Sequence, residues 1–429
     1  TAVKTTATKA QSPPTGTGKV ALVRPTRVVL DNGIVVIVQE NHSNPTIAIN
    51  SNVKAGGYFD PKGKDGVAGL TAEMIGRGTQ KRSALELASA AEFVGASLGA
   101  SADTESARFT AKSLSKDFPL MLDLLSDELR NASFPEDQFE KAKGEALSGL
   151  EESKESPKSQ AMRAFFNNVY PPGHPYHQPT FDEEASELKS ITRDDLITFH
   201  KACYRPDTMI IAISGDIKAD DAISQVKHYF GDWKAEGPTP KMEIPTISET
   251  ASKRIVIPIM DKSEVNVIFG HPMPVRRSDP DFYAARVMNQ ILGGGGALGS
   301  ILGDEIREKR GLVYDVRSTF DANIGAGPWY AAIGTNPKHV DEAVKTLQAE
   351  VAHYAKNGAT QKKFEQSREF IVGVFPIALE TNEGMARMLM NAEFYGLGMD
   401  YLKNYAKIYR SVTLQQVNAA AKKYLHTQA

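Results

Sequence analysis

The amino-acid sequence predicts an α+β protein built from two related domains. Short Val/Ile-rich runs alternate with longer segments of helical spacing, and several local patterns of the first half return in the second. A chain of 429 residues also exceeds what one hydrophobic core usually organises. Each domain is expected to be an α/β sandwich, in which helices cover a mixed sheet. We place the domains at residues 27–235 and 251–429, joined by a linker over 236–250.

The first domain is expected to open with a hairpin. The run "RVVLDNGIVVIVQEN" has a β-branched segment on either side of Asn32-Gly33, a dipeptide that tolerates the positive φ angles of a type I′ turn. The elements expected after it are a strand in "TIAINSNVKAG", helices over 83–95 and 135–154, and a short apolar strand in "TMIIAISGD".

Two pairs of landmarks indicate an internal duplication. "FDP" at 59–61 and "SDP" at 278–280 each follow an expected strand and precede an expected helix. "SITRDDLITFHKACY" and "SVTLQQVNAAAKKYL" each carry a threonine at an N-cap position, Thr192 or Thr413, with a polar residue three places later. Both pairs are separated by about 220 residues. The Pro- and Thr-rich stretch "EGPTPKMEIPTISET" falls between the two copies and is therefore assigned as the linker.

Composition and charge exclude several classes of protein. With 41% apolar and 24% charged residues the chain is typical of a globular protein, and a net charge of −2 gives no reason to expect nucleic acid as a partner. No apolar run approaches the roughly 18 residues of a membrane-spanning helix, so no membrane insertion is expected. The single cysteine, Cys203, excludes an intramolecular disulfide and a zinc cluster of thiolates.

Residues 1–26 are interpreted as a flexible leader. The first part of this segment is rich in Thr, Ala, Lys, Pro and Gly, a composition that cannot bury a core. Removal of a signal peptide leaves such an end, which favours a periplasmic location. Trimming of an initiating methionine leaves the same kind of end, so a cytoplasmic location stays open.

A series of short phrases carries a family resemblance through its order and spacing. The phrases are "LDNGIVVIV", "AGGYFDP", "GVAGL…M…GT", "HPY", "YRPDTMIIAISGD" and "LGGGGALGSILGDEIREKRGLVY". In these the chain resembles the inverted-motif zinc peptidases, a family that includes pitrilysin, insulin-degrading enzyme, and the mitochondrial processing peptidase with its bacterial relatives. The resemblance covers nearly everything after about residue 27 and is greatest to the processing-peptidase-like bacterial branch.

The resemblance also locates a degenerate zinc motif. Active members of the family bind zinc through H-x-x-E-H on one helix, with the glutamate as general base, and through a further glutamate on a second helix. In "GVAGLTAEMIGRGT" the alignment places Gly69 and Glu73 at the two histidines and Ala72 at the base. It places Gly149 at the third ligand, or Leu150 if the register slips by one. Because a catalytic zinc site needs about three protein ligands, this chain is expected to bind no metal.

Two other patterns have structural explanations. His174 and His177 have a ligand-like interval, but the prolines around them predict a loop rather than a helix that presents two imidazoles. The glycine run is followed by no Lys-Ser/Thr and is therefore not a phosphate loop. The resemblance implies a substrate-binding loop there, and a helix end followed by a turn explains the run equally well. Its residues are Gly293, Gly294, Gly295 and Gly296.

The phrase "REKRGLVY" contains the residues that the resemblance marks as functional. Arg307 is expected at the end of a helix that Gly311 stops, and Tyr314 in the strand "LVYDV". Compensation of the helix dipole explains Arg307 without any catalytic role. In the family, however, an arginine and a tyrosine at this spacing come from the half of the assembly opposite the zinc and contact the scissile region. Both side chains can donate hydrogen bonds to a developing oxyanion.

The resemblance therefore implies a non-catalytic, substrate-binding subunit of a heterodimeric zinc metallopeptidase, inactive alone. The expected partner is a homologous subunit that carries H-x-x-E-H and the zinc, while this chain binds no cofactor and supplies Arg307 and Tyr314. Two bilobed subunits would enclose a chamber that admits peptides or unfolded segments. In the family such peptides add a strand to the edge of a sheet.

Two further functions stay open from the sequence. One is a purely structural subunit, like the peptidase-derived core subunits of a respiratory complex. The other is a peptide-binding protein or chaperone that works alone as a homodimer. Independent catalysis finds no support, because the spacing of Ser, His and Asp residues indicates no triad.

Overall fold

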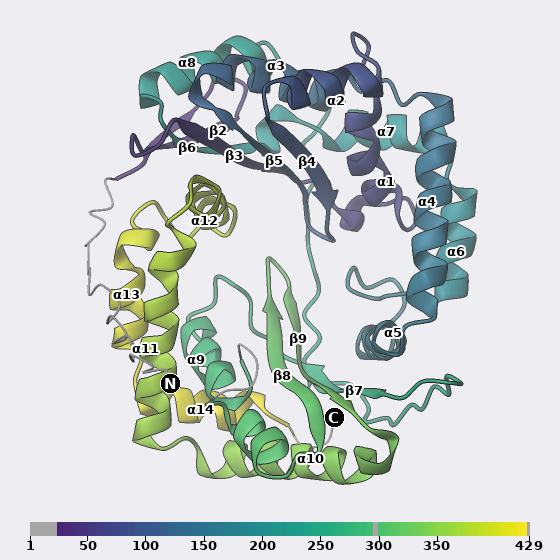
Figure 1. Ribbon diagram of the computed structural model, residues 1–429, viewed down its shortest axis with the longest axis vertical. Helices are drawn as coiled ribbons and strands as arrows, with labels where there is room; N and C mark the ends of the chain where they lie inside the picture. The colour runs from purple at the N-terminus through teal and green to yellow at the C-terminus, as the bar shows by residue number, and fades with distance from the viewer. Residues whose placement is uncertain (1–23, 295–298, 427–429) are drawn as a thin grey trace, which may run out of the picture.

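The computed structural model describes residues 24–294 and 299–426. Figure 1 shows two halves facing each other, with the N-terminal elements in the upper half and the C-terminal ones in the lower half. The N-terminal half contains strands β1 (Thr26–Val29), β2 (Val35–Glu40), β3 (Thr46–Val53), β4 (Ser97–Ala102), β5 (Ala107–Leu114) and β6 (Ile210–Gly215). Its helices are α1 (Val67–Met74), α2 (Ala84–Phe93), α3 (Phe118–Asn131), α4 (Glu136–Lys154), α5 (Pro157–Val169), α6 (Phe181–Ser190), α7 (Arg193–Cys203) and α8 (Ala219–Phe230).

The first sheet is mixed, as expected, with the strand order β1-β2-β6-β3-β5-β4. Strands β2 and β6 pair in parallel and every other pair in this sheet is antiparallel. Strands β3 and β6 are buried along almost their whole length because helices cover both of their faces. The apolar positions of α1, α3, α7 and α8 pack on one face and form the larger core of this half.

The predicted hairpin of β1 and β2 is confirmed, but its turn is not type I′. Gly33 has a φ of 95°, whereas Asn32 keeps a negative φ. The Gly33 amide donates to Leu30 O at 2.9 Å, so the loop has three residues. The Asn32 side chain is used elsewhere, since Nδ2 donates to Phe230 O and Trp233 O at the end of α8.

The C-terminal half has a smaller sheet and a second core. Its strands are β7 (Val265–Pro272), β8 (Val313–Ala322) and β9 (Ala326–Thr335), in the order β7-β9-β8. Its helices are α9 (Phe282–Leu292), the π-helix η5 (Gly303–Glu308), α10 (Val340–Asn357), α11 (Gln361–Ala378), α12 (Asn382–Phe394), α13 (Tyr401–Ser411) and α14 (Leu414–Tyr424). All pairs of this sheet are antiparallel, because the described residues form no counterparts of the parallel strands β2 and β6.

The order of elements repeats between the halves, in agreement with an internal duplication. A strand, two helices, a hairpin and five helices follow one another as β3, α1 and α2, β4–β5 and α3–α7, and again as β7, α9 and η5, β8–β9 and α10–α14. The capping boxes expected at Thr192 and Thr413 are both formed. Between α8 and β7, residues 231–264 contain no helix or strand, and the assigned linker lies within this stretch.

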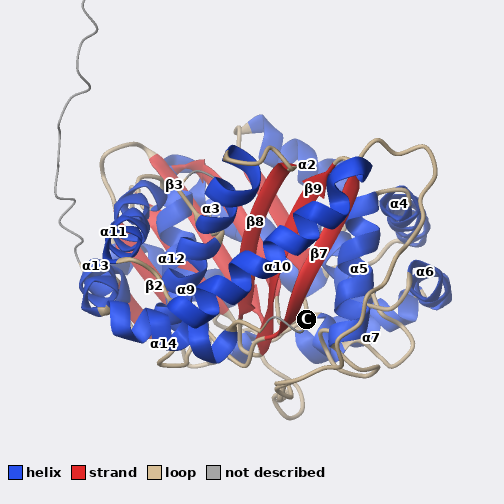
Figure 2. Ribbon diagram, turned by 90° about the horizontal axis from the view of Figure 1, so that it is seen from below, coloured by secondary structure: helices blue, strands red, loops and turns tan. Residues whose placement is uncertain are grey.

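Each half contributes one helix to the other. Helix α12 packs against β3 and β6 of the first sheet, and α5 packs against β7 of the second (Figures 1 and 2). One apolar cluster joins Ile37, Ile210 and Ala212 of the first half to Met385 and Leu389 of α12. The two halves therefore interlock instead of folding as separate lobes.

None of the helices in the described part of the chain is long and apolar enough to cross a membrane.

Candidate functional site

Helix α1 carries the positions that the sequence analysis aligns with the zinc motif, and its start is fixed by the "FDP" phrase. The Asp60 carboxylate accepts hydrogen bonds from Gly66 N at 2.9 Å and from Ala68 N at 2.7 Å. These bonds satisfy amides that lack partners at a helix start. Burial nevertheless raises the pKa of Asp60 to about 7. The carboxylate thereby sets the direction of α1 and of the motif positions that follow.

Of the four aligned zinc-motif positions, only Glu73 carries a side chain that could bind a metal. Gly69 and Glu73 are exposed on α1, Ala72 is buried, and Gly149 is exposed on α4, which packs against α1. A Cβ atom at Gly69 or Gly149 would meet no atom within 4 Å, so the scaffold has space for larger side chains at both positions. Among the described residues, no three His, Cys, Asp or Glu side chains gather where they could hold a metal ion. One carboxylate without an imidazole does not fit a catalytic zinc.

A guanidinium bridges α1 and α4 near these positions. Arg77 Nη2 lies 2.6 Å from Glu73 Oε1 and 2.5 Å from Glu145 Oε2. The Arg77 side chain is 18% exposed, and both glutamates are about half exposed. Glu73 therefore forms an ion pair within the protein through Arg77, which also pairs with Glu145 on α4.

Arg307 and Tyr314 lie where the sequence predicts. Arg307 belongs to η5, and Gly311, with a φ of 61°, donates its amide to Arg307 O at 3.0 Å. The Arg307 side chain is 43% exposed, and its Nε lies 4.0 Å from Glu308 Oε1, a weak ion pair. Tyr314 is 58% exposed on β8, which is an edge strand and contacts η5. The structure thus leaves both polar groups accessible, and they lie in the half opposite the zinc-motif positions.

The described part of the glycine run ends a helix. Gly293 follows the last residue of α9, and its carbonyl accepts a hydrogen bond from Ser318 N on β8 at 2.9 Å. A Cβ atom at Gly293 would lie 2.8 Å from that nitrogen, so close packing explains this glycine. At Gly294 a Cβ atom would lie 2.8 Å from Gln290 Cα. Gly295 and Gly296 lie outside the described residues.

The histidines of "PPGHPYHQP" are in a loop, as predicted, and His174 has a packing role. Its Nε2 contacts Pro245 O at 2.9 Å, its Nδ1 accepts from Tyr176 N at 3.0 Å, and its ring stacks on Tyr170. Burial lowers the pKa of His174, which keeps the ring neutral.

Sequence reasoning missed a buried carboxylate that joins the two halves. Glu105, in the turn between β4 and β5, is only 4% exposed. Its carboxylate accepts hydrogen bonds from Tyr176 Oη at 2.5 Å, from Gly325 N at 3.0 Å and from Ile324 N at 3.1 Å. We call this set the Glu105 clasp. The phrase "DTES" reveals only a turn, because the partners lie about 70 and 220 residues away.

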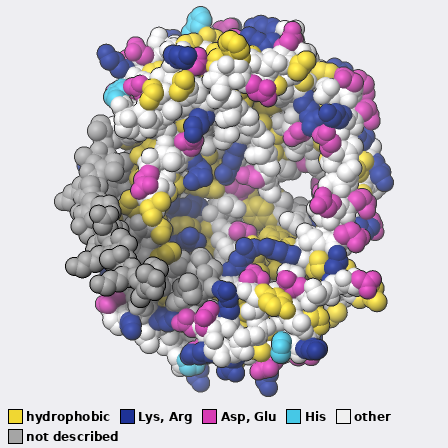
Figure 3. Space-filling model, viewed as in Figure 1, with side chains coloured by type: hydrophobic (Ala, Val, Ile, Leu, Met, Phe, Trp, Pro, Cys, Tyr) yellow, Lys and Arg dark blue, Asp and Glu magenta, His cyan; other side chains and the backbone are white. Residues whose placement is uncertain are grey.

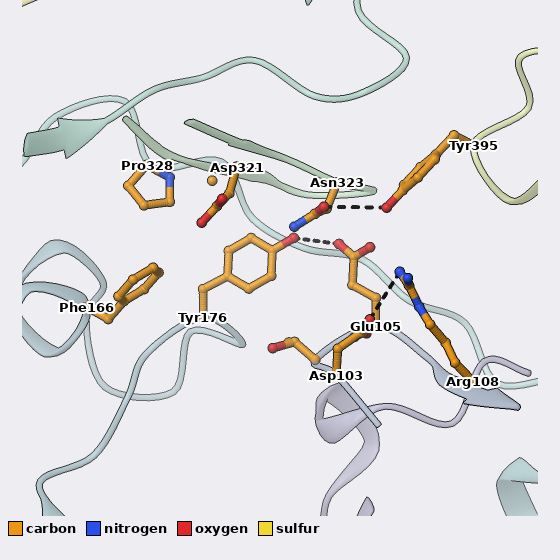
Figure 4. Close-up of a pocket in the computed structure, with 11 residues that line it drawn as sticks. Asp103, Glu105, Arg108, Phe166, Tyr176, Asp321, Asn323, Pro328 and Tyr395 are labelled. Carbon is orange, nitrogen blue, oxygen red and sulfur yellow. Dashed lines mark hydrogen bonds and ion pairs between the residues drawn. The ribbon is translucent and has the colours of Figure 1, made fainter. Parts of the chain in front are cut away.

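Beside the Glu105 clasp lies a cavity of about 160 Å³ with walls from both halves (Figure 4). The N-terminal half contributes the β4–β5 turn, β5, α5 and Tyr176, and the C-terminal half contributes the β8–β9 hairpin and Tyr395. The lining residues are Asp103, Thr104, Glu105, Arg108, Phe166, Tyr176, Asp321, Asn323, Gly327, Pro328 and Tyr395. On a larger scale, Figure 3 shows the surface hollowed between the two halves, with Lys and Arg side chains on its walls.

The fold defines a class of protein: two related α+β domains that interlock, with a glycine, an alanine and a glutamate on helix α1 at the positions aligned with the zinc motif. Two family models match the chain and give the same assignment for both halves. Residues 35–181 match the model described as "Insulinase (Peptidase family M16)", and residues 190–370 match the model described as "Peptidase M16 inactive domain". The chain belongs to the M16 peptidase family, which confirms the resemblance found in the sequence.

Individual relatives cover nearly the whole chain. An "Uncharacterized zinc protease YmxG" of Bacillus subtilis is 24% identical over 398 residues, 92% of this chain and 94% of the relative. A "Non-peptidase homolog YmxG" of Helicobacter pylori is 24% identical over 387 residues, which is 89% of this chain and 87% of the relative. A crystal structure titled as a peptidase M16 inactive domain from Pseudomonas fluorescens superposes with a TM-score of 0.87 at 28% identity, covering 95% of this chain and 96% of that one.

Proposed function

We propose that this chain is the substrate-binding, non-catalytic subunit of a heterodimeric zinc peptidase and supplies Arg307 and Tyr314 to the active site of a zinc-bearing partner. The observation that carries the proposal is an asymmetry between the halves. The zinc-motif positions hold two glycines, an alanine and a glutamate paired with Arg77, whereas Arg307 and Tyr314 keep exposed donor groups. A chain that served only as structure would not need these donors.

The sheet edges support peptide binding. Within residues 24–294 and 299–426, strand β4 pairs only with β5 and β8 pairs only with β9, so each sheet has an edge that no described strand covers. An extended peptide can add to such an edge through main-chain hydrogen bonds, which tolerate many sequences. Because Tyr314 lies on β8 itself, a peptide on that edge would run close to its phenol.

Two relatives support the pairing of an inactive with an active subunit. The Helicobacter pylori relative is described as a non-peptidase homolog. A probable mitochondrial-processing peptidase subunit beta of Arabidopsis thaliana is 28% identical over 281 residues, which is 62% of this chain and 50% of that protein. The word "subunit" in that name describes a protein that works in an assembly, and we extend this arrangement to the present chain.

The test is peptide cleavage by the complex of this chain with an M16 homologue that carries H-x-x-E-H. We expect Arg307→Ala and Tyr314→Phe each to lower kcat by about 10²–10³, because each removes one donor to the developing oxyanion. Assembly of the complex should be unchanged. Arg310→Ala is the matched control, since Arg310 is an exposed arginine only one helical turn from Arg307.

Full turnover by both variants would contradict the assigned role of this pair. If a homodimer of this chain bound peptides without any homologue, the stand-alone peptide-binding function would be favoured. If the chain co-purified only with a membrane complex, the structural-subunit function would be favoured. The periplasmic location stays a prediction from the composition of the leader, and fractionation of the source cell tests it.

A further inference from the structure

Strand β7 has an edge that no strand of the described chain covers. It pairs only with β9, whereas its counterpart in the first sheet, β3, pairs with β5 on one side and with β6 on the other. The burial of the two strands differs accordingly. Residues 265–268 of β7 are only half-buried, while β3 is buried from its second residue onward. The second sheet therefore has no described strand at the place that β6 fills in the first.

An apolar segment before β7 is also left without a strand partner. The offset between β3 and β7 is 219 residues (265 − 46), which makes residues 254–259 the counterpart of β2. Their sequence, "RIVIPI", is rich in β-branched residues, yet their backbone forms no hydrogen bond to the backbone of any described residue. Val256 is 73% exposed. Since β2 is joined to β3 only through β6, a missing β6 leaves exactly such a segment unpaired.

Helix α5 provides an apolar face beside the same strand. Its counterpart α12 packs against both β3 and β6, and covers Ile210 and Ala212 of β6. Helix α5 packs against β7 (Figure 1), and its Phe165 and Phe166 contact the Tyr330 ring on β9. Both phenylalanines are only half-buried. A strand added beside β7 would bury more of this face.

We infer that the free edge of β7 binds an extended, Val/Ile-rich segment of another polypeptide as an added strand. The strand β6 is the template, so the added strand runs antiparallel to β7 and parallel to residues 254–259. The β3–β6 register covers residues 47–52, which correspond to residues 266–271 of β7. Main-chain hydrogen bonds hold the segment, and its side chains pack alternately against α5 and against the second core. This edge is distinct from those of β4 and β8, so the inference does not rest on the proposed peptidase role.

A synthetic peptide with the β6 sequence "MIIAISGD", extended at its N-terminus by two lysines and a fluorophore, is the probe. We expect one equivalent to bind the full chain saturably, as measured by fluorescence anisotropy. Hydrogen exchange should then slow at those amides of residues 266–271 that do not face β9. A peptide with the same side chains but N-methyl groups at alternate residues cannot form the ladder, and should bind about tenfold more weakly or worse.

A pair of variants tests the contribution of residues 254–259. Val256→Asp places a charge beside the added strand, where it would lose part of its hydration, so binding should weaken by about tenfold or more. Met260→Asp is the matched control, because Met260 is equally exposed but lies in the turn after the segment. Both positions are exposed, so neither change should impair folding, which circular dichroism checks.

Several results would overturn the inference. They are the absence of saturable binding, equal binding of the N-methylated peptide, unchanged affinity in Val256→Asp, and an equal loss in Met260→Asp. Slow exchange at the edge of β7 before any peptide is added would show that the chain covers this edge itself, which also overturns the inference. Slower exchange at β4 or β8 instead of β7 would contradict this site while leaving the proposed function intact.

Discussion

At the scale of single residues, the sequence predicts which residues stand at the aligned zinc-motif positions but not which interactions they form. Glycine, alanine and glutamate at positions 69, 72 and 73 are visible in the sequence because the flanking phrases fix the register. The ion pairs of Arg77 with Glu73 and with Glu145 on α4 could not be predicted, because they depend on how two helices pack. The hydrogen-bond partners of the buried Glu105 carboxylate could not be predicted from the sequence either, since they lie far away along the chain.

Another buried carboxylate gives a prediction about pH. Glu128, on α3, is 8% exposed, and burial and the nearby Asp127 raise its pKa to about 7. Because its unfolded-state pKa is about 4.3, the folded chain binds this proton more tightly. The resulting stability is present below about pH 4 and is lost as the pH rises to about 7. Glu128→Gln has no charge to bury, so it should exceed the wild type in stability only at the higher pH.

Urea unfolding at about pH 4 and pH 8 measures this effect. We expect Glu128→Gln to gain on the order of 2–3 kcal/mol near pH 8 and nothing near pH 4. Glu140→Gln, at an exposed position of α4, is the control and should show no such dependence. An equal change at both pH values would contradict the raised pKa of Glu128.

At the scale of elements, most helices and strands follow from local pattern. The helices expected over 83–95 and 135–154 correspond to α2 and α4, and the "TMIIAISGD" strand is β6. The type I′ turn was predicted wrongly, because the Asn32 side chain binds the end of α8 about 200 residues later and the loop takes three residues. Periodicity and capping depend on neighbouring residues and can be read from the sequence. The conformation of a turn that packs against a distant helix depends on tertiary contacts and cannot.

The contact between α1 and α4 gives a prediction at this scale. Arg77→Met keeps the aliphatic stem but leaves Glu73 and Glu145 without their shared cation. We expect a loss of about 1 kcal/mol, since both glutamates are largely solvated. Chemical denaturation at low salt measures this loss, and about 1 M NaCl should reduce it by screening. A loss of the same size at both salt concentrations would point to packing rather than to the ion pairs.

At the scale of the whole molecule, the sequence indicates a duplication but not how the copies interlock. The repeated order of elements follows from landmarks about 220 residues apart. The sequence does not predict that α5 packs on the second sheet and α12 on the first, because an amphipathic helix does not specify which of two similar sheets it covers. The Glu105 clasp and its cavity arise only from this arrangement.

The Glu105 clasp gives a prediction about how the two halves are held together. Glu105→Ala removes the acceptor for one hydroxyl and two amides, and leaves these donors buried. Since hydrogen bonds to a charged group contribute about 1.5–3 kcal/mol each, we expect a lower thermal midpoint and faster proteolysis within residues 231–264. Tyr176→Phe, which removes only one donor, should have a smaller effect. Cleavage at the wild-type rate in Glu105→Ala would show that the clasp does not hold the halves together.

The central claim is that this chain works as the inactive partner of a zinc-bearing homologue. Native co-purification from the source cell, with mass spectrometry of the bound proteins, tests it most directly. We predict recovery of an M16 subunit of similar size that carries an intact H-x-x-E-H motif, in about equal amount. Recovery of the chain alone, or with respiratory subunits only, would contradict the claim.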